Sequence, residues 1–145
     1  MAIKKYLKPK PISVIIQKLN IKRKYKDIIL MNKKTMALEV NLKVKPTESS
    51  QEYTIKVLYS SLNDKPKVYV LCPEIKKRNE DSKIPHNYGL KLVEGKECIQ
   101  LCLFYKRDWD NTMNISDTII PWACEWLYFY ELWYISGVWQ GGGIH

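Results

Sequence analysis

The sequence predicts an α+β fold, an antiparallel meander of strands with an N-terminal helix and a packed C-terminal helix. Apolar and polar residues alternate over residues 36–44, 52–60 and 66–75, which is the pattern of half-buried strands. Short polar turns join these three segments, so consecutive strands can pair in opposite directions. A long run with aromatic residues at helical spacing follows nearer the C-terminus. Helices that are separate in sequence from an antiparallel sheet are typical of the α+β class.

The N-terminal helix is expected within residues 11–30. Its apolar residues Ile12, Ile15, Ile16 and Leu19 follow helical spacing, and the basic stretch KRKYKD comes after them. This spacing predicts a short amphipathic helix with these residues on its apolar side.

The C-terminal helix is expected from Ile115 to Ser136 and is the strongest element of the pattern. Its bulky residues recur every three or four positions: Trp122, Trp126, Phe129, Tyr130 and Trp133. Ser116 or Asn114 can cap its start, and Gly137 offers a stop. Pro121 lies too deep for the first turn of such a helix, so a kink or a restart is expected there. An aromatic stripe of this kind is mostly core, although aromatic residues are also enriched at interface centres.

The net charge of +9 is concentrated near the N-terminus. Residues 1–35 contain eleven Lys and Arg against one Asp, residues 36–100 eleven against nine acidic residues, and residues 101–145 two against five. Such a basic segment is a solvated surface, a docking surface for an acidic protein, or a site for nucleic acid. The sequence leaves these alternatives open, and nucleic acid is the least favoured.

The cysteines predict a reduced, cytoplasmic protein without a metal site. There are four in 145 residues, and the basic first residues lack the apolar core of a secretory signal. No C-x2-C pair exists, and the intervals of 26, 4 and 22 residues between the cysteines do not fit a zinc ribbon or finger. No Gly-rich phosphate loop occurs, so we expect no nucleotide cofactor either. The apolar runs are too short or carry too many charges to cross a membrane.

Cys102 lies in the apolar run LCLFY and is followed at once by KRDWD. It is either a small buried hydrophobe or a nucleophile at the mouth of a loop. A catalytic thiol must be accessible and reactive as the thiolate, and Lys106 and Arg107 lie near enough in sequence to stabilise one. Cys98 is the local rival, but it lacks the flanking pair of leucines. Cys72 and Cys124 are expected in the core.

Several segments resemble ubiquitin-conjugating enzymes. The run YTIKVLYSSLNDKPKVYVLCPEI is similar to their second and third strands, and LCLFYKRDWDNTMNISDTIIPW is similar to their active-site stretch. Closer still, IPHNY, LCLFY, Trp109, IIPWACEWLYFYELW, SGVW and GGGIH together resemble the ubiquitin-conjugating-like proteins of bacterial type II CBASS operons. Those operons couple a cGAS-like nucleotidyltransferase to antiphage defence.

The resemblance implies a single ubiquitin-conjugating-like domain over residues 1–145, with a basic helical segment over 1–35 and an active-site loop region over 76–101. Cys102 would carry, as a thioester, the C-terminal tail of the nucleotidyltransferase and pass it to an amine. Since the chain shows no nucleotide-binding motif, a separate activating enzyme would act first, or the tail would arrive already activated. The alternative is a non-enzymatic module whose basic N-terminal third docks on the nucleotidyltransferase or on nucleic acid.

The resemblance assigns roles to three more residues. His86 matches a Pro-His of the CBASS proteins and would orient the loop or assist proton transfer. The alternative is a purely structural histidine that bonds the loop backbone. Asn87 follows it where ubiquitin-conjugating enzymes have His-Pro-Asn, and an amide donor there would stabilise the oxyanion of the tetrahedral intermediate. Asn87 precedes Cys102 by fifteen residues, farther than in those enzymes. Trp109 would support the active-site loop.

Overall fold

The computed structural model describes residues 9–26, 28–30 and 37–142 and confirms the α+β class. Two helices and six strands occur in these parts of the chain. In chain order they are α1 (Val14–Lys24), β1 (Ile28–Leu30), β2 (Leu38–Val44), β3 (Tyr53–Tyr59), β4 (Lys67–Cys72), β5 (Asn87–Val93), β6 (Lys96–Leu101) and α2 (Ile119–Ser136).

All six strands form one antiparallel sheet in the order β1-β2-β3-β4-β6-β5. The predicted meander is confirmed as β2, β3 and β4, in which Val57 lies opposite Val40 on one side and Val68 on the other. The third strand stops before Pro73, as expected from its missing N–H. Residue 36, the predicted first residue of the first strand, lies outside the described residues.

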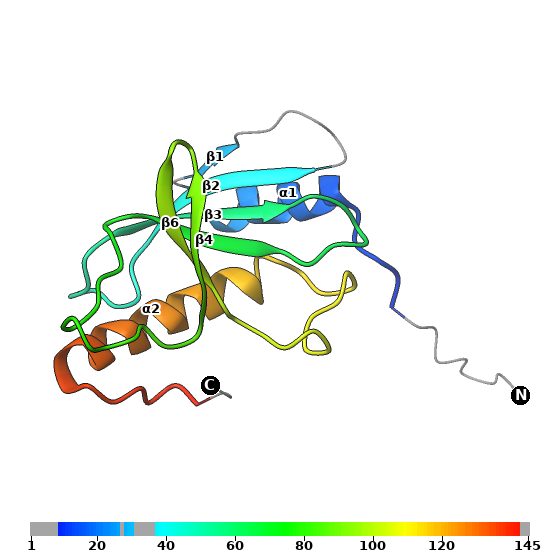
Figure 1. Cartoon of the computed structure of the whole chain (residues 1–145). Coiled ribbons are helices and arrows are strands. Elements are labelled where there is room, and N and C mark those ends of the chain that lie inside the picture. The colour runs from blue at the N-terminus through cyan, green and yellow to red at the C-terminus, as the bar shows by residue number, and fades with distance from the viewer. Residues whose placement is uncertain (1–8, 27, 31–36, 143–145) are drawn as a thin grey trace, which may run out of the picture.

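Both helices pack on one face of the sheet and share its core (Figure 1). Alternate residues of β2 and β3 point to this face, which explains their periodicity of two. The largest fully buried side chains of the core are Trp109, Tyr53, Tyr59, Ile21, Leu38, Leu42, Ile55, Ile115, Ile119, Ile120 and Leu127. Most of the aromatic stripe of α2 is therefore core, since Trp126, Tyr130 and Trp133 are buried, whereas Trp122 and Phe129 are half-buried.

The β5–β6 hairpin crosses the opposite face of the sheet (Figure 1). Tyr69, Leu71 and Cys98 form a small apolar cluster there, with Val93 packed against it. The buried Lys56 amine pairs with Glu39 and reaches Glu94 in the hairpin turn at 3.4 Å. These contacts hold the hairpin against the sheet.

The expectation of an irregular loop through residues 76–97 is wrong beyond residue 86, where the hairpin begins. Its turn contains Glu94 and Gly95, with φ of 50° and 81°, which is the backbone of a tight two-residue hairpin turn. In a sequence, Glu-Gly is a weaker signal of a hairpin turn than Asn-Gly or Asp-Gly. Most of β5 is also exposed, so the strand lacks the buried stripe of alternate residues that marks a half-buried strand. Residues 76–86 contain no helix or strand, as predicted.

The predicted N-terminal helix exists but buries a different side. The oxygen of the Ser13 side chain accepts from the Ile16 N–H and caps the helix, and Val14, Gln17 and Ile21 form its buried stripe. Ile15, Ile16 and Leu19 are instead more than 40% exposed. The later part of the predicted helical segment, residues 28–30, forms the edge strand β1, which the sequence analysis missed.

Gln17 explains this rotation of α1. Its side chain is fully buried, donates to the Met113 carbonyl at 2.9 Å, and accepts from the Ile115 N–H at 2.9 Å. Buried polar groups need such partners, so the helix turns Gln17 rather than Ile15 and Ile16 inward. The contact ties α1 to the turn that leads into α2.

Replacing Gln17 by leucine is therefore expected to lower the free energy of unfolding by about 2–3 kcal/mol, because two buried backbone groups lose their partners. Urea unfolding followed by tryptophan fluorescence measures it. Lys22→Leu on the exposed side of the same helix is the control and should change stability by less than about 0.5 kcal/mol. Equal stability of the two variants would contradict the bridging role of Gln17.

The start of α2 differs from the prediction in a way that removes the expected kink. The helix begins at Ile119, with Thr118 as N-cap residue rather than Ser116 or Asn114. Pro121 consequently falls within the first turn, where no intrahelical partner for an N–H is needed. The predicted stop is confirmed, since Gly137 has a φ of 79° and its N–H donates to the Trp133 carbonyl. Neither helix in the described residues is both long and apolar enough to cross a membrane.

Candidate active site

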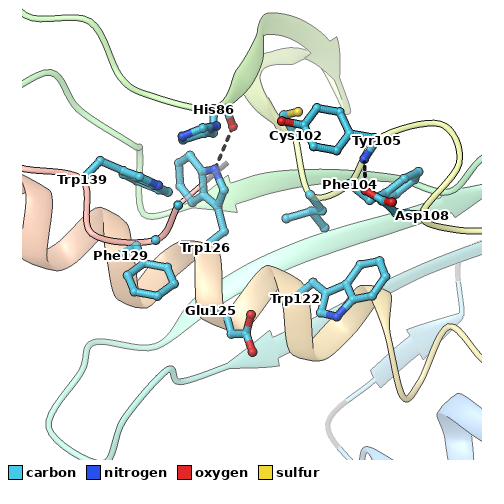
Figure 2. Close-up of a pocket in the computed structure, with 13 residues that line it drawn as sticks. His86, Cys102, Phe104, Tyr105, Asp108, Trp122, Glu125, Trp126, Phe129 and Trp139 are labelled. Atoms are coloured by element: carbon cyan, nitrogen blue, oxygen red, sulfur yellow. Dashed lines mark hydrogen bonds between the residues drawn. The ribbon is translucent and has the colours of Figure 1, made fainter. Parts of the chain in front are cut away.

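Cys102 is the first residue after β6 and lies where that strand, β5 and α2 meet (Figure 2). Its backbone N–H donates to the His86 carbonyl at 3.1 Å. The same carbonyl accepts from the indole N–H of Trp126 in α2 at 2.7 Å. One carbonyl thus connects the backbone of Cys102 to α2, through a tryptophan that belongs to the aromatic stripe predicted to be mostly core.

A cavity of about 250 Å³ opens beside Cys102, between the segment after β6 and one side of α2 (Figure 2). Six aromatic side chains line it: Phe104, Tyr105, Trp122, Trp126, Phe129 and Trp139. Two carboxylates, of Asp108 and Glu125, also line it. Cys102 itself is half-buried, which meets the first requirement for a nucleophile, access to a substrate.

Tyr88 is the residue that the sequence analysis missed. Its hydroxyl lies 3.4 Å from the Cys102 sulfur, although its side chain is 54% exposed. Hydrogen bonding to Cys102 and, to a smaller extent, burial raise the pKa of Tyr88 to about 12. The hydroxyl therefore stays protonated at neutral pH and can donate to the sulfur when Cys102 is a thiolate.

We expect Tyr88→Phe to slow alkylation of Cys102 by iodoacetamide at pH 7 about three- to tenfold, because the thiolate loses a hydrogen bond worth about 1 kcal/mol. Mass spectrometry of the peptide containing Cys102 gives the rate. Tyr128→Phe removes a comparably exposed hydroxyl on α2 and is the matched control. If both variants react at the wild-type rate, Tyr88 does not stabilise the thiolate.

His86 contributes its backbone to the site, and its ring lies on the cavity wall. The residue has a φ of 50°, in the left-handed region that non-glycine residues rarely adopt. Its ring packs on Trp139 with 5.1 Å between ring centroids. The carbonyl contacts with Cys102 and Trp126 fit the orienting role of the prediction, and a role in proton transfer stays a prediction.

The amide of Asn87 is engaged in its own loop. Its nitrogen donates to the Ile84 carbonyl at 2.6 Å and to the Pro85 carbonyl at 3.4 Å, and its oxygen accepts from the Gly89 N–H at 2.8 Å. Asn87 lies opposite Leu101, next to Cys102, so it is near the site. In this arrangement its amide shapes the turn before β5, and the oxyanion role remains a prediction.

Trp109 is 1% exposed and belongs to the main core. Its indole N–H donates to the Thr118 hydroxyl at 3.0 Å, and its ring meets Tyr59 edge to face at 5.6 Å. Phe104, which lines the cavity, lies 6.3 Å from it. These contacts are compatible with the predicted supporting role of Trp109, which stays a prediction.

The other three cysteines are free thiols in less suitable places. Cys98 is buried, and burial raises the pKa of its thiol. Cys124 packs against the core, and its pKa is raised for the same reason. Cys72 is exposed, so its predicted core position is wrong, because β4 ends there before Pro73. None of these three lines the cavity.

A comparison with protein families decides what kind of protein this is. Residues 17–145 match the model of the family described as type II CBASS E2 protein. The chain belongs to this family. The match confirms the resemblance stated from the sequence, and it covers β5, β6, Cys102 and α2. This type II CBASS E2 protein is thereby an E2-like protein associated with CBASS antiviral defence; no curated protein matches it.

Proposed function

We propose that this type II CBASS E2 protein has a ubiquitin-conjugating-like fold and is an acyl transferase whose Cys102 carries the acyl group as a thioester. The donor is the C-terminal carboxyl of a cGAS-like nucleotidyltransferase, and the acceptor is an amine. The observation that carries the proposal is the half-buried Cys102 sulfur at the cavity, in contact with the Tyr88 hydroxyl, in a chain of this family.

The proposed reaction has two steps. The Cys102 thiolate attacks the activated carbonyl carbon of the tail, a C–S bond forms, and the activating group leaves through a tetrahedral oxyanion. An amine nitrogen then attacks the thioester, a C–N bond forms, and the C–S bond breaks to return the thiolate. The amine gives up its proton to a base. A separate activating enzyme supplies the activated carboxyl, or the donor arrives already activated.

The charges around the cavity favour an amine as the acceptor. Asp108 and Glu125 line it, and their carboxylates attract an ammonium group and can accept its proton. The hydroxyl of Tyr88 accepts from the Cys102 thiol in this structure, and it can donate once the sulfur is a thiolate. This freedom suits Tyr88 to stabilising the oxyanion better than Asn87, whose amide is engaged in its own loop. His86 orients the nucleophile through its carbonyl.

A docking module is the second candidate, and α1 supports it. Ile15, Ile16 and Leu19 are exposed on this helix, and Lys22 and Arg23 lie exposed in its last turn. An apolar patch beside basic residues suits an acidic protein partner. In that case the protein would bind the nucleotidyltransferase without using its thiol.

Phage protection by the complete operon separates the two candidates. We expect Cys102→Ala to abolish protection, whereas Lys22→Glu with Arg23→Glu should retain most of it. Immunoblotting confirms that each variant is present at wild-type level. Retention of protection by Cys102→Ala, together with its loss in the charge-reversed variant, would establish the docking module instead.

A further inference from the structure

The free edge of the sheet beside Cys102 carries side chains that the fold does not explain. Strand β5 is last in the sheet order and, within the described residues, pairs with β6 alone. Leu90 and Leu92 on this strand are 60% and 78% exposed. Proteins usually protect such an edge, because its unpaired backbone groups and apolar side chains pair readily with another chain.

The two leucines lie on the outer face of the hairpin. Leu90 is opposite Ile99 and Leu92 is opposite Glu97, so they share one face, while Val93 on the other face packs on the cluster of Tyr69 and Leu71. The ion pair between Glu94 and Lys56 holds the hairpin turn in place. The hairpin is therefore held through Val93 on one face and through Ile99 of β6, which reaches the main core on the other face, while Leu90, Leu92 and the edge of β5 are left for a partner.

Strand β5 starts next to the Cys102 sulfur. Its first residue, Asn87, is opposite Leu101, and the next, Tyr88, contacts the Cys102 sulfur through its hydroxyl at 3.4 Å. The strand then runs away from Cys102 towards the hairpin turn. A chain lying along its free edge in the opposite direction would end at Cys102 with its carboxyl group.

We propose that the β5 edge binds the C-terminal tail of the acyl donor as an added antiparallel strand. This inference rests on the proposed function and adds the class of donor tail that the site takes. The tail is an extended segment of about six residues, spanning about 20 Å, with apolar side chains at alternate positions that meet Leu90 and Leu92. Backbone hydrogen bonds to β5 supply affinity, and the alternate side chains supply specificity.

The first test uses backbone chemistry and leaves the protein unchanged. The probe is a fluorescein-labelled peptide with about the last twelve residues of the operon's nucleotidyltransferase, and anisotropy gives its Kd. Because every second residue of an added strand directs its N–H to β5, two peptides N-methylated on alternate sets of amides should differ at least tenfold in Kd. Equal affinity of the two methylated peptides, or no binding of the unmodified one, would overturn the proposal.

The second test uses variants on opposite edges of the sheet. Leu92→Lys should weaken binding of the unmodified peptide at least tenfold, because its apolar contact is lost. Ile29→Lys changes an isoleucine that is 64% exposed on β1, the other edge strand, and should bind like wild type. Circular dichroism shows that both variants are folded. If Leu92→Lys binds as wild type, or only converts a dimer into monomers, the edge serves another purpose and the proposal fails.

These results are separable from the fate of the proposed function. The unactivated peptide binds without reacting, so its binding does not depend on thioester formation. Binding that depends on β5 without any thioester in the conjugation assay would support the docking edge and contradict the transferase. A thioester that forms equally well in Leu92→Lys would support the transferase and overturn the docking edge.

Discussion

Cys102→Ala is expected to lower the rate of conjugate formation with the nucleotidyltransferase by at least about 10³-fold, because no other thiol lines the cavity. Cys102→Ser is expected to form an adduct slowly and to retain it, because the resulting oxygen ester is discharged less readily than a thioester. Gel analysis of time courses with the purified partner and its activating enzyme gives both rates.

Cys72→Ala is the matched control for this prediction. Cys72 is the exposed cysteine of the chain, yet it lies outside the cavity, so its removal should leave the rate unchanged. Cys98 is buried and serves less well, since its replacement also disturbs packing. A loss of conjugation in Cys72→Ala, with activity retained in Cys102→Ala, would show that Cys72 and not Cys102 is the nucleophile.

Trp109→Ala is expected to lower the free energy of unfolding by about 3–5 kcal/mol, a large share of the stability of a typical domain. The substitution empties a fully buried site and removes the contacts with Tyr59 and Phe104. It also leaves the Thr118 hydroxyl without its indole donor. Chemical denaturation measures the change, and thermal unfolding should shift by about 10 °C or more.

Two further variants define what Trp109 contributes. Trp109→Phe keeps an aromatic ring but loses the bond to Thr118, so a smaller loss of about 1–2 kcal/mol is expected. Trp122→Ala removes a half-buried ring from the cavity wall and should cost less than Trp109→Ala. Stability of Trp109→Ala within about 1 kcal/mol of wild type would show that this ring does not support the loop.

The parts of the fold that follow from local periodicity were predictable. Strands β2 and β3 bury every second residue, β4 is a short apolar run bounded by prolines, and α2 buries aromatic residues at helical spacing, so these patterns are visible in the sequence. The hairpin is different, because β5 is mostly exposed and its turn uses Glu94 and Gly95. The orientation of α1 also depends on one buried polar contact, that of Gln17 with residues distant in sequence.

The candidate site was predictable at Cys102 and less so around it. Cys102 was singled out by its sequence neighbours and by the resemblance, and it lines the cavity. Tyr88 was missed because its hydroxyl meets the sulfur only after β5 and β6 pair, across fourteen residues of sequence. Trp126 had been assigned to the core, and its bond to the His86 carbonyl depends on how α2 is placed. The pairing of strands and the placement of a helix depend on residues far apart in sequence, so a short stretch of sequence does not predict these contacts.

Intact-mass measurement of the wild-type protein co-expressed with its operon's nucleotidyltransferase tests the central claim most directly. We predict a species with the mass of both chains less one water, absent after treatment with thiol or hydroxylamine. In Cys102→Ser a thiol-resistant species of the corresponding mass should replace it. Co-purification of the two chains without any covalent species, in wild type and variant alike, would contradict thioester transfer through Cys102.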